Sequence, residues 1–204
     1  MIREHLKYMP GKELALDCGA GIGRVTKTVL KHIFKNVDLL EPSKTQMVEA
    51  RKYCPEARKF HHIGLQEFEY REPYDAIWIQ WVLCYLTDED IVHFLLKTKR
   101  DGLTRDEKGK TGLIFIKENT SEQSQFLLDT EQNAVWRNKM QLKAIFQSAG
   151  YQVLHESQQG GNRVQRAGIM SITCFVLKPI FEGTSKMQQI SIKLESESGE
   201  PKMS

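Results

Sequence analysis

Residues 14–23 read LALDCGAGIG, and this stretch decides the fold. Its first four residues form an apolar run that is typical of a buried strand, and Gly19, Gly21 and Gly23 follow it. Apolar residues then recur at helical spacing over 25–33. The order is strand, glycine turn, helix. In such an arrangement the backbone can approach a ligand closely, and the helix N-terminus can hold an anionic group.

The alternation of strand and helix continues along the chain. Apolar runs predict further strands over residues 37–41, 58–63, 74–80, 113–117, 151–155 and 171–177. Helical periodicity predicts helices that begin near Pro42 and run through Ala50, over 88–99, and over 131–149. Seven strands with intervening helices indicate an α/β protein, with a mostly parallel sheet and helices on both faces. Ligands of such sheets bind beyond the carboxyl ends of the strands.

Composition places the chain among ordinary globular proteins. It has 204 residues, of which 40% are hydrophobic and 27% charged, so we expect one main domain. That domain is expected over residues 1–180. Residues 181–204 lose the dense apolar pattern and gain Ser, Glu and Lys, which predicts a disordered polar tail.

The net charge and the cysteines limit which binding partners and which compartment we expect for this protein. A formal net charge of +3 neither requires nor excludes a nucleic-acid partner, and we expect none. The four cysteines lie far apart, without a C-x-x-C pair or a histidine at zinc spacing, so we expect no metal site and a reducing compartment. The most apolar stretch, 76–83, is too short to span a membrane and contains Gln80. We therefore expect a cytoplasmic or nuclear protein without a membrane partner.

Two polar residues near the glycine turn indicate the class of ligand. Glu41, at the end of the second expected strand, is placed for a carboxylate that accepts hydrogen bonds from ribose hydroxyls. The third small residue of the dinucleotide fingerprint is replaced by Arg24, whose guanidinium suits a carboxylate ligand better than a pyrophosphate. S-adenosylmethionine carries such a carboxylate. The alternative is a plain tight turn with an exposed arginine in the first helical turn.

Further motifs agree with one family. The segments LDCGAGIGR (16–24), GLQEF (64–68), IWIQWV (77–82), LTD (86–88) and KEN (117–119) resemble those of the protein alpha-N-terminal methyltransferases. These are class I, S-adenosylmethionine-dependent enzymes. The resemblance covers roughly residues 13–177, and the IWIQWV run discriminates better than the glycine loop. It implies a Rossmann-like methyltransferase fold, S-adenosylmethionine as cofactor, and a protein or peptide N-terminus of the X-Pro-Lys type as substrate.

The resemblance also implies roles for single residues. Those implied for the cofactor lie on the glycine turn, after the second strand, in the GLQEF segment and at the end of the fourth strand: Gly19, Gly21 and Arg24 for the methionine end, Glu41, Pro42 and Ser43 for the ribose, Leu65 and Gln66 for the adenine, and Gln80 near the sulfonium. For the substrate, Trp81 would pack on the proline, Asn119 would bind the amino end, and Asp129 would help receive a lysine. Plainer alternatives are that Gln66 caps a turn, that Asn119 bonds local backbone, and that Trp78 belongs to the core.

The chain departs from the family where a proton must be accepted. A free α-amino group has a pKa of about 7.7 to 8.0, so methyl transfer requires that its proton leave. The family supplies a His and an Asp, and the aligned residues here are Tyr85 and Gln132, with Glu131 adjacent. Tyrosine, with an ordinary pKa near 10, is a poor base at neutral pH. The candidate catalytic residues are therefore Asn119, Tyr85 and Glu131.

Three functions stay open at this point. The first is an active N-terminal methyltransferase in which Glu131, Tyr85 or solvent takes the proton. The second is a class I methyltransferase with a different acceptor, and the third is a cofactor-binding or scaffolding homologue without activity. Only residues 1–13 precede the first strand, where family members usually carry a longer helical cover, so a partner chain that supplies this cover is a further expectation.

Overall fold

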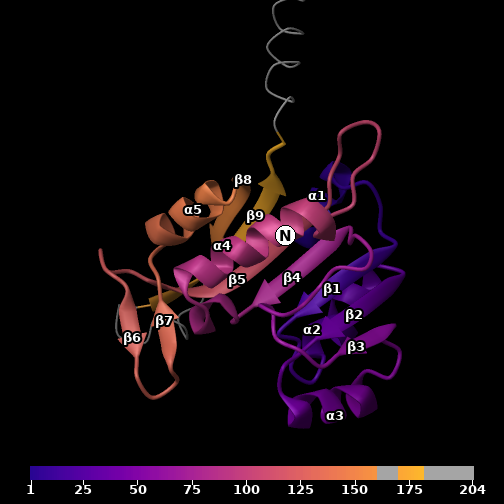
Figure 1. Cartoon of the computed structure of the whole chain (residues 1–204), viewed down its shortest axis with the longest axis horizontal. Helices are drawn as coiled ribbons and strands as arrows, with labels where there is room; N and C mark the ends of the chain where they lie inside the picture. The colour runs from indigo at the N-terminus through magenta and orange to yellow at the C-terminus, as the bar shows by residue number, and fades with distance from the viewer. Residues whose placement is uncertain (160–169, 182–204) are drawn as a thin grey trace, which may run out of the picture.

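The computed structural model describes residues 1–159 and 170–181, and these residues form one twisted sheet covered by helices (Figure 1). The sheet has seven strands in the order β3-β2-β1-β4-β5-β9-β8. Their bounds are β1 Leu14–Cys18, β2 Asn36–Leu40, β3 Lys59–His61, β4 Ala76–Gln80, β5 Leu113–Ser121, β8 Tyr151–Gln158 and β9 Met170–Pro179. Strands β1 to β5 pair in parallel, whereas β9 runs antiparallel to both β5 and β8. The predicted α/β class with a mostly parallel, seven-stranded sheet is confirmed.

Helices cover both faces of the sheet. The side chains of each strand point alternately to one face and the other, so apolar residues on both faces need a cover. Ile77 and Ile79 of β4 point to the face covered by α4 (Asp88–Lys97) and α5 (Lys139–Ser148). Trp78 of the same strand points to the opposite face, toward α1 (Ile2–His5) and the short helix η2 (Leu30–His32) that follows α2 (Arg24–Thr28). Helix α3 (Lys44–Tyr53) packs on Leu39. Trp78 is therefore a core residue.

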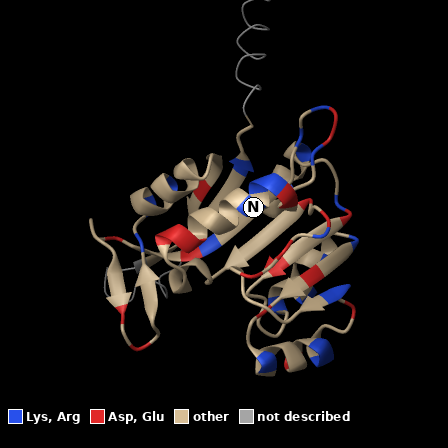
Figure 2. Ribbon diagram, in the orientation of Figure 1, with Lys and Arg blue, Asp and Glu red and all other residues tan. Residues whose placement is uncertain are grey.

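Several boundaries differ from those predicted. The third strand is shorter than residues 58–63, the fifth continues to Ser121, and the helix that begins near Pro42 starts at Lys44. Helix α4 has three acidic residues in its first turn and Lys97 in its last, the charge order that the helix dipole favours (Figure 2).

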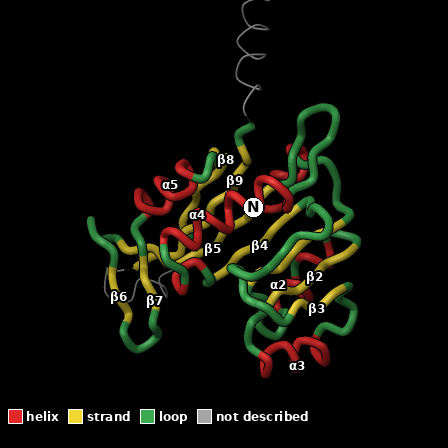
Figure 3. Tube along the Cα trace, viewed as in Figure 1, coloured by secondary structure: helices red, strands yellow, loops and turns green. Residues whose placement is uncertain are grey.

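The helix predicted over residues 131–149 is wrong in its first half. Strands β6 (Leu127–Asp129) and β7 (Ala134–Trp136) form an antiparallel hairpin there, set to one side of the large sheet (Figures 1 and 3). The Asp129 carboxylate accepts the backbone N–H groups of Glu131 (3.1 Å) and Gln132 (3.0 Å), which fixes the turn. Asn133 adopts a positive φ of 50°, which ends any helical path.

Helix α5 begins at a capping box instead. The Asn138 side chain accepts the backbone N–H of Gln141 (2.9 Å), and the Gln141 side chain accepts the backbone N–H of Asn138 (3.0 Å). Both interactions satisfy donors that a helix start otherwise leaves unpaired. The helix therefore starts at Lys139.

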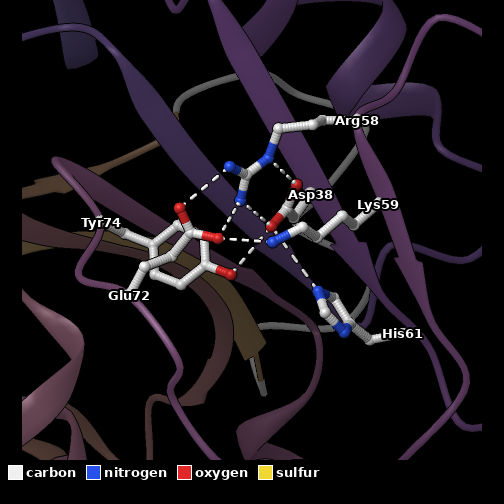
Figure 4. A network of polar contacts seen from close by, with 6 residues as sticks. All are labelled: Asp38, Arg58, Lys59, His61, Glu72 and Tyr74. Atoms are coloured by element: carbon white, nitrogen blue, oxygen red, sulfur yellow. Dashed lines mark hydrogen bonds and ion pairs between the residues drawn. The ribbon is translucent and has the colours of Figure 1, made fainter.

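A polar network braces the long connection between β3 and β4 (Figure 4). Asp38 of β2 accepts hydrogen bonds from Arg58 (2.6 and 2.8 Å) and from the Tyr74 hydroxyl (3.0 Å), and Arg58 also donates to Glu72 (2.8 and 3.0 Å). Burial alone would raise the pKa of Asp38, but the hydrogen bonds from Arg58 and Tyr74, together with the nearby His61 ring (3.6 Å), outweigh burial and lower it to about 2. The network ties this connection, which carries residues 64–67, to β2 and β3.

None of the helices in the described ranges is both long and apolar enough to cross a membrane. The polar tail predicted over 181–204 lies, beyond Phe181, outside the described residues.

Candidate active site

A cleft of about 1060 Å³ lies at the carboxyl ends of β1, β2 and β4, where a parallel sheet is expected to bind ligands. The glycine turn, Glu41 and Pro42, the segment 64–67, and the residues after β4 line it. This volume is at the upper end of the range for small-molecule pockets, so a ligand of nucleoside size or larger fits.

The glycine turn needs its glycines. Gly19 and Gly21 have φ of 64° and 58°, a region that side chains with a Cβ rarely adopt. A Cβ on Gly19 would collide with Val82, and one on Gly21 would lie 2.8 Å from the Gln46 side-chain oxygen. Both glycines line the cleft, and their contact with the cofactor stays a prediction.

Glu41 ties the glycine turn to the start of α3. One carboxylate oxygen accepts the Gly21 N–H (2.9 Å) and the other accepts the Ser43 N–H (2.8 Å). Glu41 and Pro42 line the cleft, but Ser43 does not. The Ser43 hydroxyl caps α3 by accepting the Gln46 N–H at 3.4 Å, so the structure gives Ser43 a local role.

Asp17 is a second acidic residue of the cleft. Its carboxylate accepts the Thr26 hydroxyl (2.7 Å) and the Thr26 N–H (3.1 Å), which holds the start of α2 against β1. Burial raises the pKa of Asp17 to about 7, and the nearby Glu41 charge acts in the same direction. Sequence reasoning did not single it out, although a lone carboxylate inside an apolar strand was the available signal.

Arg24 and the 64–67 segment flank the glycine turn. Arg24 is exposed and lines the cleft, and within the described residues its guanidinium has no hydrogen-bond or ion-pair partner. Leu65 is buried and Gln66 exposed, and both line the cleft. The cleft thus presents the Arg24 cation, which has no partner among the described residues, on its wall together with the buried Leu65.

The wall beyond β4 carries an aromatic residue in an unusual conformation. Trp81 has a φ of 55° and is 38% exposed, and both it and Gln80 line the cleft. The backbone N–H of Trp81 donates to the Lys117 carbonyl (3.0 Å), and the Lys117 ammonium lies 5.3 Å from the centre of the Trp81 ring. Left-handed backbone costs a non-glycine residue about 1–2 kcal/mol, and such strain concentrates at functional sites. Lys117 also lines the cleft and was not among the predicted site residues.

Tyr85 ends the short helix η3 (Leu83–Tyr85) and lines the cleft with 57% of its side chain exposed. Its pKa is raised above 10, first by partial burial and then by the negative charges of neighbours that include Glu118 and Asp129. At neutral pH the hydroxyl therefore keeps its proton, so Tyr85 is unsuited to act as a base.

Besides Ser43, three predicted residues lie outside the lining of the cleft: Asn119, Asp129 and Glu131. Asn119 is half-buried on β5, and its N–H donates to the Glu118 carboxylate (3.1 Å). Asp129 fixes the hairpin turn, and its negative charge helps to raise the pKa of Tyr85. Glu131 is exposed in the turn of the hairpin.

Residues 1–178 match the family described as AdoMet dependent proline di-methyltransferases. The chain belongs to this family. It is 42% identical over 151 residues to alpha N-terminal protein methyltransferase 1 of Dictyostelium discoideum, a match that covers 72% of the chain and 53% of that relative. The human N-terminal Xaa-Pro-Lys N-methyltransferase 1 is 39% identical over 155 residues, which cover 73% of the chain and 66% of the relative.

A solved structure agrees with these relatives. The SAM-dependent methyltransferase of Leishmania major superposes with a TM-score of 0.74 at 34% identity, covering 87% of the chain and 70% of that protein. The chain spans between about half and two thirds of the length of the curated relatives it matches. The cofactor of the family is S-adenosylmethionine, and the cleft fits it in volume, in the available Arg24 cation and in the Glu41 carboxylate.

Proposed function

We propose that this protein transfers methyl groups from S-adenosylmethionine to the α-amino group of protein N-termini of the X-Pro-Lys type. The observation that carries the proposal is Trp81, whose strained backbone places a half-exposed aromatic ring on the cleft wall directly after Gln80. An aromatic face there suits the ring of a proline, and the relatives named for Xaa-Pro-Lys methylation support the same substrate class.

Each side of the cleft has its own task. The bound cofactor supplies a methyl group on a positively charged sulfonium. Arg24 binds the cofactor carboxylate, Glu41 and Pro42 the ribose, and Leu65 and Gln66 the adenine, with Gly19 and Gly21 allowing close approach. Gln80 lines the cleft directly before Trp81 in the chain, and its proposed task is a contact near the sulfonium. Asn119 and Asp129 bind the amino end and the lysine of the substrate as it extends from the cleft toward the hairpin.

The acceptor amine must be neutral to attack the methyl group. Tyr85 holds its own proton at neutral pH, and Glu131 is exposed in the hairpin turn. We propose that the amine of the substrate loses its proton to solvent and that the Tyr85 hydroxyl orients it by hydrogen bonding. The rate then rises with pH through the amine pKa of about 7.7 to 8.0.

The test is methylation of a short peptide that begins X-Pro-Lys, followed by mass spectrometry. We expect a gain of one or more methyl groups at the amino end. The same peptide with an acetylated N-terminus is the control, and it should gain none. Trp81→Ala should raise the peptide KM by roughly tenfold, because loss of an aromatic contact weakens binding by about 0.5–1.5 kcal/mol beyond the lost area. Equal methylation of the acetylated peptide would contradict the proposal.

A different acceptor is the second candidate, and the replacement of the family's His by Tyr85 favours it. No methylated peptide together with intact S-adenosylhomocysteine binding would select this candidate. Absence of cofactor binding would select a scaffolding role.

We also propose that another chain covers the open side of the cleft, where Trp81 and Tyr85 are exposed. The free thiols of the four cysteines support a reducing location, cytoplasm or nucleus.

A further inference from the structure

The turn that follows Trp81 is held from its amino end by a buried carboxylate. Glu118 of β5 is 2% exposed. One of its oxygens accepts the Leu83 N–H (3.0 Å), and the other accepts the Asn119 N–H (3.1 Å). The neighbouring N–H groups of Cys84 and Val82 also favour the charged form of this carboxylate. One side chain therefore holds the turn at Leu83 and is stabilised by the backbone on either side of that residue.

The same turn is held from its other end by a buried guanidinium. Arg137 directly follows β7 and is 4% exposed. It donates to the carbonyls of Leu83 (3.0 Å) and Leu86 (2.7 Å), and its third nitrogen donates to Asp88 (2.6 Å). Its planar fork can bind both carbonyls at once, a geometry that a lysine ammonium does not reproduce.

Part of this turn lines the cleft, whereas Leu83 and Cys84 are buried and do not line it. Trp81, Val82 and Tyr85 line it, and Val82 packs so closely on Gly19 that a methyl group on Gly19 would collide with it. The turn therefore forms the acceptor wall of the cleft and rests on the glycine turn that forms the cofactor wall.

Burying two opposite charges against backbone is an expensive way to stabilise a turn. Desolvation of each ion costs several kcal/mol, and apolar replacements of similar volume are often as stable. Burial raises the pKa of Glu118 to about 7, although the surrounding N–H groups oppose that shift. The two charged groups contribute directional hydrogen bonds. Because these bonds hold the turn at both ends, they restrict it to a single conformation.

We propose that Glu118 and Arg137 are positioning residues that hold the 81–86 turn so that Trp81 and Tyr85 face the acceptor. The identity of the acceptor rests on the function proposed above, whereas the geometry of the turn does not. Because Arg137 follows β7, the clamp also links the hairpin to the acceptor wall.

The first test measures backbone hydrogen exchange by NMR in Glu118→Gln and Arg137→Lys. The amides of residues 82–84 should exchange roughly tenfold faster or more in Glu118→Gln, as expected for the loss of charge-assisted bonds, while β1 and β4 keep their protection. Lys143→Gln is the matched control, because it removes an exposed ion pair with Glu156 and should leave the turn unchanged. Unchanged exchange at 82–84, or equal acceleration in β1 and β4, would overturn the proposal.

The second test separates positioning from simple loss of structure. In both variants the peptide KM should rise roughly tenfold, while the affinity for S-adenosylhomocysteine changes less than about threefold. An unchanged peptide KM would overturn the proposal. If the wild-type protein methylates no X-Pro-Lys peptide, the proposed function fails and the exchange data alone decide the clamp. If a variant does not fold, the wild-type Leu83 amide decides it, because a bond to Glu118 requires that this amide be protected.

Discussion

Arg24 carries a charge that the described part of the fold does not use. It stands at the first position of α2, exposed and on the wall of the cleft, whereas its neighbour Lys27 donates to the Tyr53 carbonyl (2.6 Å). A side chain without internal partners contributes little to folding stability, so its removal separates binding from folding.

Arg24→Ala should therefore weaken S-adenosylhomocysteine binding without lowering Tm. The expected loss is on the order of 1.5 to 3 kcal/mol, or about 10- to 150-fold in Kd, because a charge-assisted bond to the ligand carboxylate disappears. Isothermal titration calorimetry gives the affinity and thermal unfolding gives Tm. Lys27→Ala is the control on the same helix and should bind as the wild type does. An unchanged affinity in Arg24→Ala would show that another group holds the carboxylate.

The place of residues at strand ends could be predicted, because the end of a strand can be recognised from the apolar pattern of the sequence alone. Gly19, Glu41 and Gln80 each terminate or follow an apolar run, and each lines the cleft. Lys117 and Glu118 escaped prediction as site residues because their contacts are with a turn some 35 residues away. No local pattern records such a contact.

Helix α5 was predicted to begin too early in the chain, although the apolar pattern on which that prediction rested is present. Ala134, Val135 and Trp136 continue an apolar pattern into residues 139–148, and a short apolar run fits a strand as well as a helix. Side-chain hydrogen bonds decide between them: Asp129 closes the hairpin turn and Asn138 starts the helix. Both residues prefer turns and caps, which was the local signal for a boundary.

Asn138→Ala should destabilise the protein by about 1 kcal/mol, the usual cost of removing an N-cap. The Asn138 side chain also donates to the Ser124 carbonyl (2.8 Å), so it joins the helix start to the chain before the hairpin. Urea unfolding measures the change. Asn138→Asp keeps the acceptor for the Gln141 N–H but loses that donor, so it should recover most of the stability. Equal loss in both variants would assign the effect to the Ser124 contact.

At the scale of the whole molecule, the parallel strands bring distant segments to one edge. Residues that follow β1, β2 and β4 meet at the cleft, together with Lys117 of β5, because the carboxyl ends of parallel strands lie side by side. The alternation of strands and helices predicted this gathering. It did not predict that β9 lies between β5 and β8 and runs antiparallel to both, since strand order depends on long-range pairing.

Four carboxylates with shifted pKa values make opposite contributions to the stability of the protein as pH changes. Glu118 and Asp17 have pKa values raised to about 7 from ordinary values of 4.5 and 3.8, so between those limits the folded chain holds protons that the unfolded chain has released. Their contribution to the free energy of unfolding is greatest below about pH 4 and is lost as pH rises through 7. Asp38 and Glu72 have pKa values lowered to about 2, so their contribution is present above pH 4.5 and is lost as pH falls through 2.

Together these four groups place the maximum stability of the unliganded protein near pH 4 to 4.5, with a decline toward neutral pH. Urea midpoints measured from pH 2 to 8 give the curve. Glu118→Gln cannot titrate at this position, so its decline between pH 4.5 and 7 should be shallower than that of the wild type, whereas Asp38→Asn should flatten only the acidic limb. A wild-type curve that rises steadily from pH 4.5 to 7 would mean that the Glu118 and Asp17 carboxyls ionise in the folded protein as readily as they do in water.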